Sequence, residues 1–309
     1  MSYEGKMLKD LEMPSRKEVE KALLKILLRH NGVIKEFTSG EEIVNEIANE
    51  FGLNESQRTA VLKRTYRKEN RIVKSLLWHR LLYRAADSLA KEKLVSRPTS
   101  TIHLTNKKEW MLTENGFDEA LKLLNISEIQ KEFLLTKSFE VQKVVKRLTE
   151  APRPKNYDPF DKGKQVTMVT RESAIRTRGF RQAVIEAYDY KCAFCGMKIN
   201  TPDSLLWEVE AAHIVPHKLN GRDDVLNGLS LCRLHHWAFD AGWFTLEDDF
   251  RIRVSSQVNS LPSDFGKMGS YDFIRIFFNK NSKMLLPERK EIYPHQNAMK
   301  WHRTNKFYR

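Results

Sequence analysis

Apolar residues recur at helical spacing in the first third of the chain. Ser15 and Glu18 are placed to form a capping box, and Asn31 with Gly32 ends the helix that they begin. The apolar positions of this helix are Val19, Ala22, Leu23, Ile26 and Leu27. The same period predicts three more helices, at residues 39–51, about 54–67 and 72–91.

Short strand-like stretches follow these helices. Residues 101–104 and 109–113 could pair as a hairpin, and helices followed by a small hairpin predict a winged-helix fold. Another helix fits residues 128–147, and the Pro-rich segment after it breaks regular structure. We therefore predict an α+β protein with three parts. They are a winged-helix, DNA-recognition domain at 1–125, a helical linker at 126–165 and a second domain at 166–309.

Composition narrows the class of partner. A net charge of +13 over 309 residues suits a polyanion, although basicity alone is weak evidence. The apolar runs are too short to span a bilayer, and the first ten residues lack the apolar core of a secretory signal. We expect a cytoplasmic protein with no membrane partner.

A basic run lies on and beside the predicted third helix. In a winged helix the third helix commonly enters the major groove, so this run is a candidate DNA-binding face. The residues that we expect to contact DNA are Arg64, Arg67, Lys68 and Arg71. A solvated helix face, balanced by acidic residues elsewhere, is the alternative interpretation.

The three cysteines of the chain form part of a metal-binding pattern. Cys192 and Cys195 share one tight turn, and Cys232 with His235 repeats the same spacing. Three thiolates and one imidazole make a tetrahedral Zn²⁺ site with no position left for water, which indicates a structural zinc. A redox dithiol or a buried pair is the alternative for an isolated CxxC motif, but it leaves Cys232 and His235 unexplained.

Three motifs surround this zinc pattern: EAAHIVP at residues 210–216, NGLSLC at 227–232 and HHWAFD at 235–240. Together they resemble the HNH, or ββα-metal, endonuclease family, in the branch with AHIxP, NGLxLC and HHxxFD motifs. The resemblance covers about residues 176–309 and implies a zinc-stabilised nuclease domain. Residues 14–124 resemble, by their pattern of elements, the winged-helix module found beside Mrr-type restriction nucleases.

The family resemblance implies a role for each matching residue. His213 would be the general base, and a neutral imidazole near pH 7 can accept a proton from the attacking water. Asn227 would brace the loop through its amide and orient the base. His236 and Asp240, one helical turn apart, would bind a catalytic Mg²⁺ or Mn²⁺ that neutralises charge on the phosphate.

One departure from the commoner family pattern concerns the metal ligands. Many members have a metal ligand immediately before the base, where this chain has Ala212. Glu210 lies two residues earlier on the same strand face and is a candidate replacement. Lys218 and Arg222, in the loop after the base, are candidate phosphate contacts, although surface cations need no such role.

The sequence thus predicts an endonuclease that cuts double-stranded DNA, with one module for recognition and one for cleavage. A restriction or defence role, directed in some cases at modified bases, fits the pairing of the two modules. Double-strand cleavage calls for a homodimer or for two successive nicks. The alternatives are a zinc-stabilised DNA-binding regulator without cleavage activity and a ribonuclease.

Overall fold

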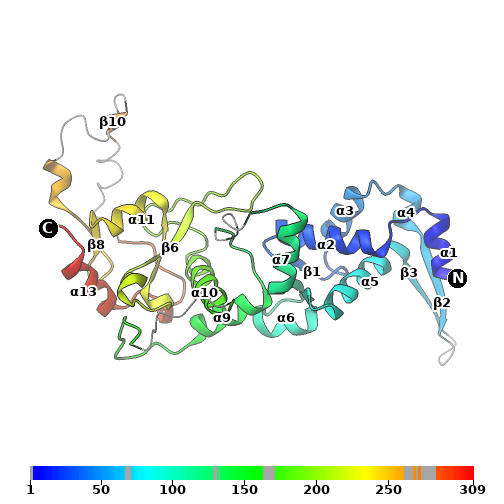
Figure 1. Cartoon of the computed structure of the whole chain (residues 1–309), viewed down its shortest axis with the longest axis horizontal. Coiled ribbons are helices and arrows are strands. Elements are labelled where there is room, and N and C mark those ends of the chain that lie inside the picture. Colours follow the sequence, from blue (N-terminus) through cyan, green and yellow to red (C-terminus); the bar gives the residue numbers. More distant parts are fainter. Residues whose placement is uncertain are drawn as a thin grey trace. The chain divides into compact units, whose positions relative to one another are not determined.

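The computed structural model describes residues 3–66, 71–127, 131, 133–162, 171–260, 267, 268, 271, 272 and 283–309. The chain divides into two compact units, residues 1–142 and 143–309 (Figure 1). In the part of the chain that is described, no helix combines the length and apolar character that a membrane span requires.

The first unit is mainly helical. Its helices are α1 (Tyr3–Asp10), α2 (Arg16–Arg29), α3 (Glu41–Glu50), α4 (Glu55–Thr59), α5 (Leu77–Lys91), α6 (Pro98–Thr105) and α7 (Glu114–Leu123). As predicted, α2 begins at a capping box formed by Ser15 and Glu18. It is the central helix of the unit, packing against both α5 and α7. The indole N–H of Trp78, on α5, donates to the carbonyl oxygen of Val44 on α3 at 3.2 Å.

A small antiparallel sheet closes this core, and its hairpin differs from the one predicted. The strands are β1 (Val33–Lys35), β4 (Val95–Ser96) and β5 (Glu109–Leu112), in the order β1-β5-β4. Residues 101–104, which we expected to pair with 109–113, instead belong to helix α6. Pro98 occupies the first turn of α6, where its fixed φ and missing N–H favour a helix start.

The predicted third helix is wrong over most of its length. Helix α4 ends at Thr59, and the chain continues as a two-stranded antiparallel ribbon of β2 (Val61–Tyr66) and β3 (Arg71–Leu76). Its β-branched residues are Val61, Thr65, Ile72 and Val73, which favour an extended backbone. The predicted fourth helix therefore starts at Leu77 rather than at residue 72.

The helix predicted at 128–147 also begins later than expected. Helix α9 spans Phe139–Glu150, and residues 134–138 before it are not helical. The hydroxyl of Ser138 accepts from the backbone N–H of Val141 at 3.3 Å, which gives α9 its N-terminal cap. Residues 128–130 and 132 lie outside the described part of the chain.

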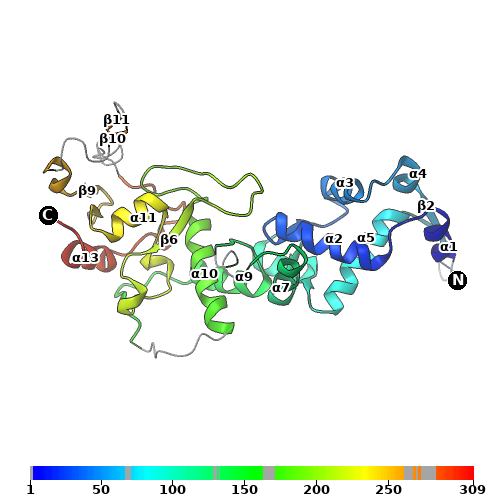
Figure 2. The ribbon, with the colours of Figure 1, turned by 45° about the horizontal axis from the view of Figure 1, so that its top comes forward.

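The second unit is built around a hairpin followed by a helix. Its elements are α10 (Arg171–Ala187), β6 (Val209–His213), β7 (Gly228–Cys232), α11 (Arg233–Asp240), β8 (Phe244–Leu246), β9 (Ile252–Val254), β10 (Lys267–Met268), β11 (Tyr271–Asp272) and α13 (Gln296–Asn305), with short 3-10 turns η1 (His217–Leu219), η2 (Val225–Asn227), η3 (Ser256–Ser260) and η4 (Lys290–Ile292). Strands β6 and β7 pair antiparallel, with His213 opposite Gly228. Helix α10 packs against both strands, and α11 contacts them as well (Figure 2).

Close packing fixes α10 against the hairpin. A Cβ added at Gly228 would lie 2.4 Å from the Val184 side chain and 3.2 Å from the ring of Phe180, both on α10. Any larger residue at the start of β7 would therefore require the α10 side chains to shift. The resulting ββα arrangement holds the ends of β6 and α11 on one rigid support.

Candidate active site and metal centre

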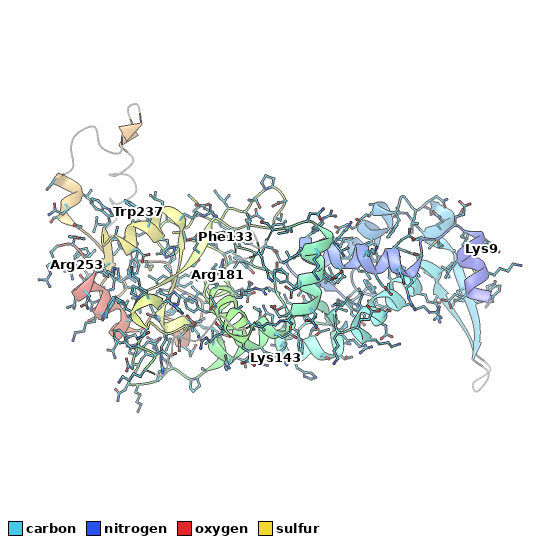
Figure 3. All side chains as sticks on the ribbon, viewed as in Figure 1. Lys9, Phe133, Lys143, Arg181, Trp237 and Arg253 are labelled. Carbon is cyan, nitrogen blue, oxygen red and sulfur yellow. The ribbon has the colours of Figure 1, made fainter. Side chains whose placement is uncertain are left out.

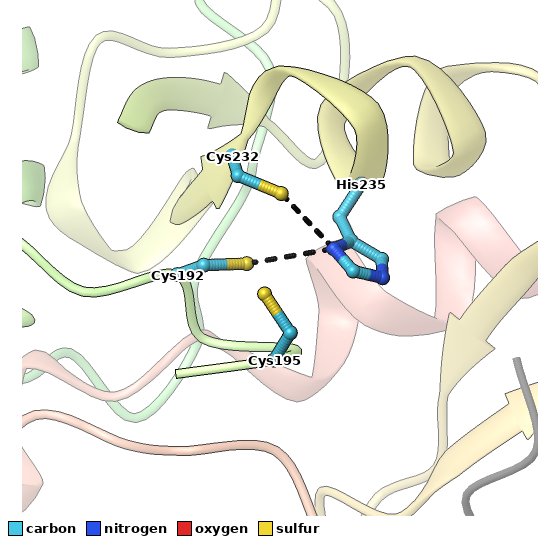
Figure 4. Close-up of side chains that lie close together, drawn as sticks. All are labelled: Cys192, Cys195, Cys232 and His235. Carbon is cyan, nitrogen blue, oxygen red and sulfur yellow. Dashed lines mark hydrogen bonds between the residues drawn. The ribbon is translucent and has the colours of Figure 1, made fainter. Parts of the chain in front are cut away.

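The four predicted zinc ligands lie together in the second unit (Figure 4). Cys192 and Cys195 come from the turn after α10, Cys232 ends β7, and His235 lies in the first turn of α11. Their ligand atoms all lie within 4.8 Å of one another. The Sγ atoms of Cys192 and Cys232 are 3.8 Å and 3.0 Å from Nδ1 of His235.

The chemistry of this Cys3His cluster fits zinc. Contacts with the thiols of Cys195 and Cys232 lower the pKa of Cys192, which favours the thiolate form that binds metal. Cys192, Cys232 and His235 are almost completely buried. The ring of Phe194 stacks on His235 at 4.0 Å and fixes its plane. The cluster could hold a zinc ion that ties β7 and α11 to the Cys192 turn.

His213 stands at the end of β6, where two neighbours fix its ring. Its Nε2 lies 3.0 Å from Oδ1 of Asp223, and its ring stacks on Phe180 at 4.2 Å with 24° between the planes. The side chain of Asp223 is only 4% exposed, against 18% for His213. Arg176, on α10, places Nε 3.4 Å from the other carboxylate oxygen.

Asn227 is fully buried and bonds only to backbone groups of the β6–β7 loop. Its Oδ1 accepts from the N–H of Val215 at 2.9 Å. Its Nδ2 donates to the carbonyl oxygens of Val215 and Arg222, at 3.1 Å and 3.0 Å. These bonds join the two ends of the loop that carries Asp223 and hold it beside His213.

His236 lies on α11 between two carboxylates. Its Nδ1 is 2.8 Å from Oε2 of Glu210 on β6, and its Nε2 is 3.7 Å from Oδ2 of Asp240. The hydrogen bond with His236 lowers the pKa of the Glu210 carboxyl. Burial lowers the pKa of His236, but the bond with Glu210 and the charge of Asp240 outweigh burial and raise it. Trp237, the next residue of α11 and labelled in Figure 3, is 59% exposed.

The structure arranges the predicted site residues in two groups, one around His213 and one around His236, and each group includes one residue of β6. Glu210 and His213 are three residues apart on β6, which corresponds to roughly 10 Å along the strand. Among the described residues, the Cys3His cluster is the only group of three or more His, Cys, Asp or Glu side chains placed so that it could hold a metal ion. The carboxylates around His236 thus stand close to its ring without closing into a second complete cluster.

The remaining predicted contacts are placed less specifically. Lys218 and Arg222 are exposed in the β6–β7 loop. Arg64 lies on β2 and Arg71 on β3, whereas Arg67 and Lys68 lie outside the described residues.

The sequence analysis did not predict that three residues around His213 belong to the site. They are Asp223, Arg176 and Phe180, whose ring stacks on the imidazole. Asp223 follows Arg222 in a polar loop, and only its position four residues before Asn227 could have drawn attention to it.

Comparison with known proteins supports the assignment of the ββα region. Residues 192–247 match the HNH endonuclease family. A solved structure, described as a modification dependent TagI restriction endonuclease, is similar with 19% identity and a TM-score of 0.28. The similarity covers 40% of this chain and 36% of that one. No curated protein sequence gives a significant match. The family match spans β6, β7, α11 and all four residues of the Cys3His cluster, so this is the region in which the chain is similar to HNH endonucleases.

Proposed function

We propose that this protein is a metal-dependent endonuclease that hydrolyses phosphodiester bonds in double-stranded DNA. The observation that carries the proposal is the arrangement on β6 within the HNH domain. One end of the strand holds His213 against a buried carboxylate, and Glu210, near the other end, lies against His236 of α11. In this proposal the hairpin supplies the proton acceptor and, together with α11, a set of metal ligands.

His213 acts as the general base in this proposal. It takes one proton from a water molecule whose oxygen forms a new bond to phosphorus. The bond from phosphorus to the 3′ oxygen breaks, its electron pair stays on that oxygen, and solvent supplies the proton. The product carries a 5′-phosphate. Asn227 positions the loop beside the base through its three backbone hydrogen bonds.

His236, Asp240 and Glu210 would hold the catalytic Mg²⁺ or Mn²⁺. One imidazole and two carboxylates suit either ion and leave positions for water and phosphate. The bound ion would neutralise charge that develops on the phosphate and on the leaving oxygen. The contact between Glu210 and His236 supports Glu210 as the replacement for the ligand missing at Ala212.

Cleavage of a plasmid tests this assignment. The zinc-loaded protein should cut plasmid DNA with Mg²⁺ or Mn²⁺ and lose activity with EDTA. His213→Ala and His236→Ala should each lower the rate by at least ~100-fold, the scale of general acid–base catalysis. His103→Ala, an exposed histidine on α6, is the matched control and should cleave as the wild type does.

Two results would redirect the assignment. DNA binding without cleavage would favour the DNA-binding regulator, and faster hydrolysis of RNA than of duplex DNA would make the protein a ribonuclease. Cleavage that survives both EDTA and His213→Ala would reject the assigned chemistry.

The first unit is proposed to select the DNA. Its order of elements, α2-β1-α3-α5-β4-β5 with the sheet order β1-β5-β4, supports a winged helix in which α5 is the third main helix. The β2–β3 ribbon is an insertion before α5. It carries Arg64 and Arg71 on its strands, and the proposed contacts Arg67 and Lys68 lie between those strands in the sequence.

Charge distribution supports the ribbon as the DNA contact of this unit. Residues 1–142 hold 25 Lys and Arg against 21 Asp and Glu, a surplus of four positive charges. Strands β2 and β3 alone hold four basic residues and no acidic one: Lys63, Arg64, Arg71 and Lys74. The rest of the unit is therefore neutral, and a two-stranded ribbon is narrow enough for the major groove. Lys218 and Arg222 are the proposed phosphate contacts of the second unit.

We further propose a restriction or defence role, with modified DNA as one class of target. The support is the combination of an HNH domain with a separate unit suited to DNA recognition. Matched plasmids with and without modified cytosine or adenine test the preference. Selective cutting of one modified plasmid would support it, and equal cutting of all plasmids would exclude it.

The ratio of nicked to linear product would show whether a homodimer or successive nicks cut both strands.

A further inference from the structure

Asp223 is a buried carboxylate directly against the proposed base. Its side chain is 4% exposed, and a carboxylate so buried is stable only with partners that compensate its charge. Two of its partners contact different carboxylate oxygens. Oδ1 lies 3.0 Å from Nε2 of His213, and Oδ2 lies 3.4 Å from Nε of Arg176.

These contacts determine which ring nitrogen of His213 carries the proton. An ionised carboxylate can only accept hydrogen bonds, so the neutral imidazole must donate through Nε2–H. Its lone pair is then on Nδ1. No other hydrogen bond holds the ring among the described residues, and stacking on Phe180 keeps its plane fixed.

The surrounding loop is built to keep Asp223 in place. The backbone of Arg222, the preceding residue, receives a hydrogen bond from Asn227, and its own N–H donates to the carbonyl of Pro159 at 2.9 Å. These two bonds hold the chain at the residue directly before Asp223.

We propose that Asp223 is the positioning residue of the catalytic base: it fixes the Nε2–H tautomer of His213 and so makes Nδ1 the proton acceptor. The inference rests on the proposed endonuclease function. In the step, one proton moves from water to Nδ1 as the water oxygen bonds to phosphorus. The resulting imidazolium keeps its Nε2–H against Asp223, whose negative charge stabilises it.

Asp223→Asn gives a specific expectation because Arg176 can only donate hydrogen bonds. The positive charge of Arg176, whose Nε forms an ion pair with Oδ2 at 3.4 Å, favours the amide oxygen on its side, which leaves the NH2 group facing Nε2 of His213. His213 must then accept at Nε2 and carry its proton on Nδ1, the wrong tautomer for catalysis. Asp224→Asn is the matched control, because it makes the same charge change one residue away and asparagine also caps turns.

Two measurements on the zinc-loaded full-length protein test the proposal. Nitrogen-15 NMR of labelled histidines should show Nε2–H for His213 in the wild type and in Asp224→Asn, and Nδ1–H in Asp223→Asn. Single-turnover cleavage at saturating protein should slow by roughly 10²–10⁴-fold in Asp223→Asn, with the DNA concentration for half-saturation nearly unchanged. Asp224→Asn should stay within about threefold of the wild type. Equal zinc content and equal melting temperatures of the wild type and both variants would show that the variants fold.

Either of the two measurements can overturn the inference. A wild-type His213 protonated on Nδ1 would reject it, as would Asp223→Asn cleaving as fast as Asp224→Asn. If the wild type cleaves no nucleic acid, the endonuclease proposal fails by itself. The NMR comparison would then still decide whether Asp223 sets the tautomer of His213.

Discussion

At the scale of single residues, His302 shows how the fold keeps a buried imidazole neutral. It is 2% exposed, and its Nε2 donates to the carbonyl oxygen of Phe239 at 3.1 Å. Its Nδ1 therefore accepts from the hydroxyl of Thr245, at 2.9 Å. Burial lowers the pKa of His302 to about 4, because a charged imidazolium loses its hydration in the interior, so protonation opposes folding.

This depressed pKa predicts a loss of stability in acid. Between about pH 6.5 and pH 4 the unfolded chain binds the proton and the folded chain does not, so stability falls as pH falls. The full difference corresponds to about 3 kcal/mol. Urea unfolding of the wild type and of His302→Gln, at pH 7 and pH 5, measures it. The variant should lose less stability on acidification, and equal losses would show that His302 does not contribute.

The candidate site could be predicted from the sequence where the residue types themselves indicate a chemical role, as cysteine and histidine do. Cysteines at matching spacing indicated the zinc cluster, and His213, Asn227 and His236 were identified by motif. Asp223 was not, because a carboxylate in a polar loop resembles any solvated residue until folding buries it. Its role depends on Arg176 and Phe180, which lie more than forty residues earlier on α10.

At the scale of elements, the β2–β3 ribbon has the clearest charge pattern. Lys63 and Lys74 are paired directly across the two strands, and both are exposed. Like charges directly opposite each other destabilise a ribbon, and a bound polyanion would relieve that repulsion. Neither lysine has an ion-pair partner among the residues that the structure describes.

Neutralising these two lysines should therefore weaken DNA binding in a salt-dependent way. Each phosphate contact contributes about 0.9 to the slope of log affinity against log salt concentration. The double variant Lys63→Gln, Lys74→Gln should lower that slope by about 2, measured by fluorescence anisotropy with duplex DNA. Lys17→Gln, Lys21→Gln on α2 removes the same charge from exposed positions and should leave the slope unchanged. Equal effects of the two variants would mean that the ribbon has no special role.

The ribbon also shows why part of the fold could not be predicted from sequence. Long amphipathic helices such as α2 and α5 followed from apolar spacing, although α5 begins five residues later than predicted. Residues 61–76 have apolar residues that fit either period, and basic residues do not discriminate between a helix and a ribbon. Pairing between β2 and β3 decided the outcome, and such pairing is not visible in either strand alone.

At the scale of the whole molecule, the two units differ in what stabilises them. All four residues of the Cys3His cluster belong to the second unit, where they join β7 and α11 to the Cys192 turn. The first unit has its own apolar core around α2, independent of any cysteine. Removing zinc should therefore affect only one of the two units.

Hydrogen exchange with and without a strong zinc chelator measures this difference. Zinc binding contributes about 10–16 kcal/mol in small zinc-folded peptides, so its loss should strongly reduce protection in β6, β7 and α11. Protection in α2 and α5 should change little. Cys195→Ser should reproduce the chelator effect without any chelator, because it removes one ligand from the same cluster. If α2 lost as much protection as α11, the two units would unfold together. If protection in α11 did not change, the cluster would not hold a stabilising ion.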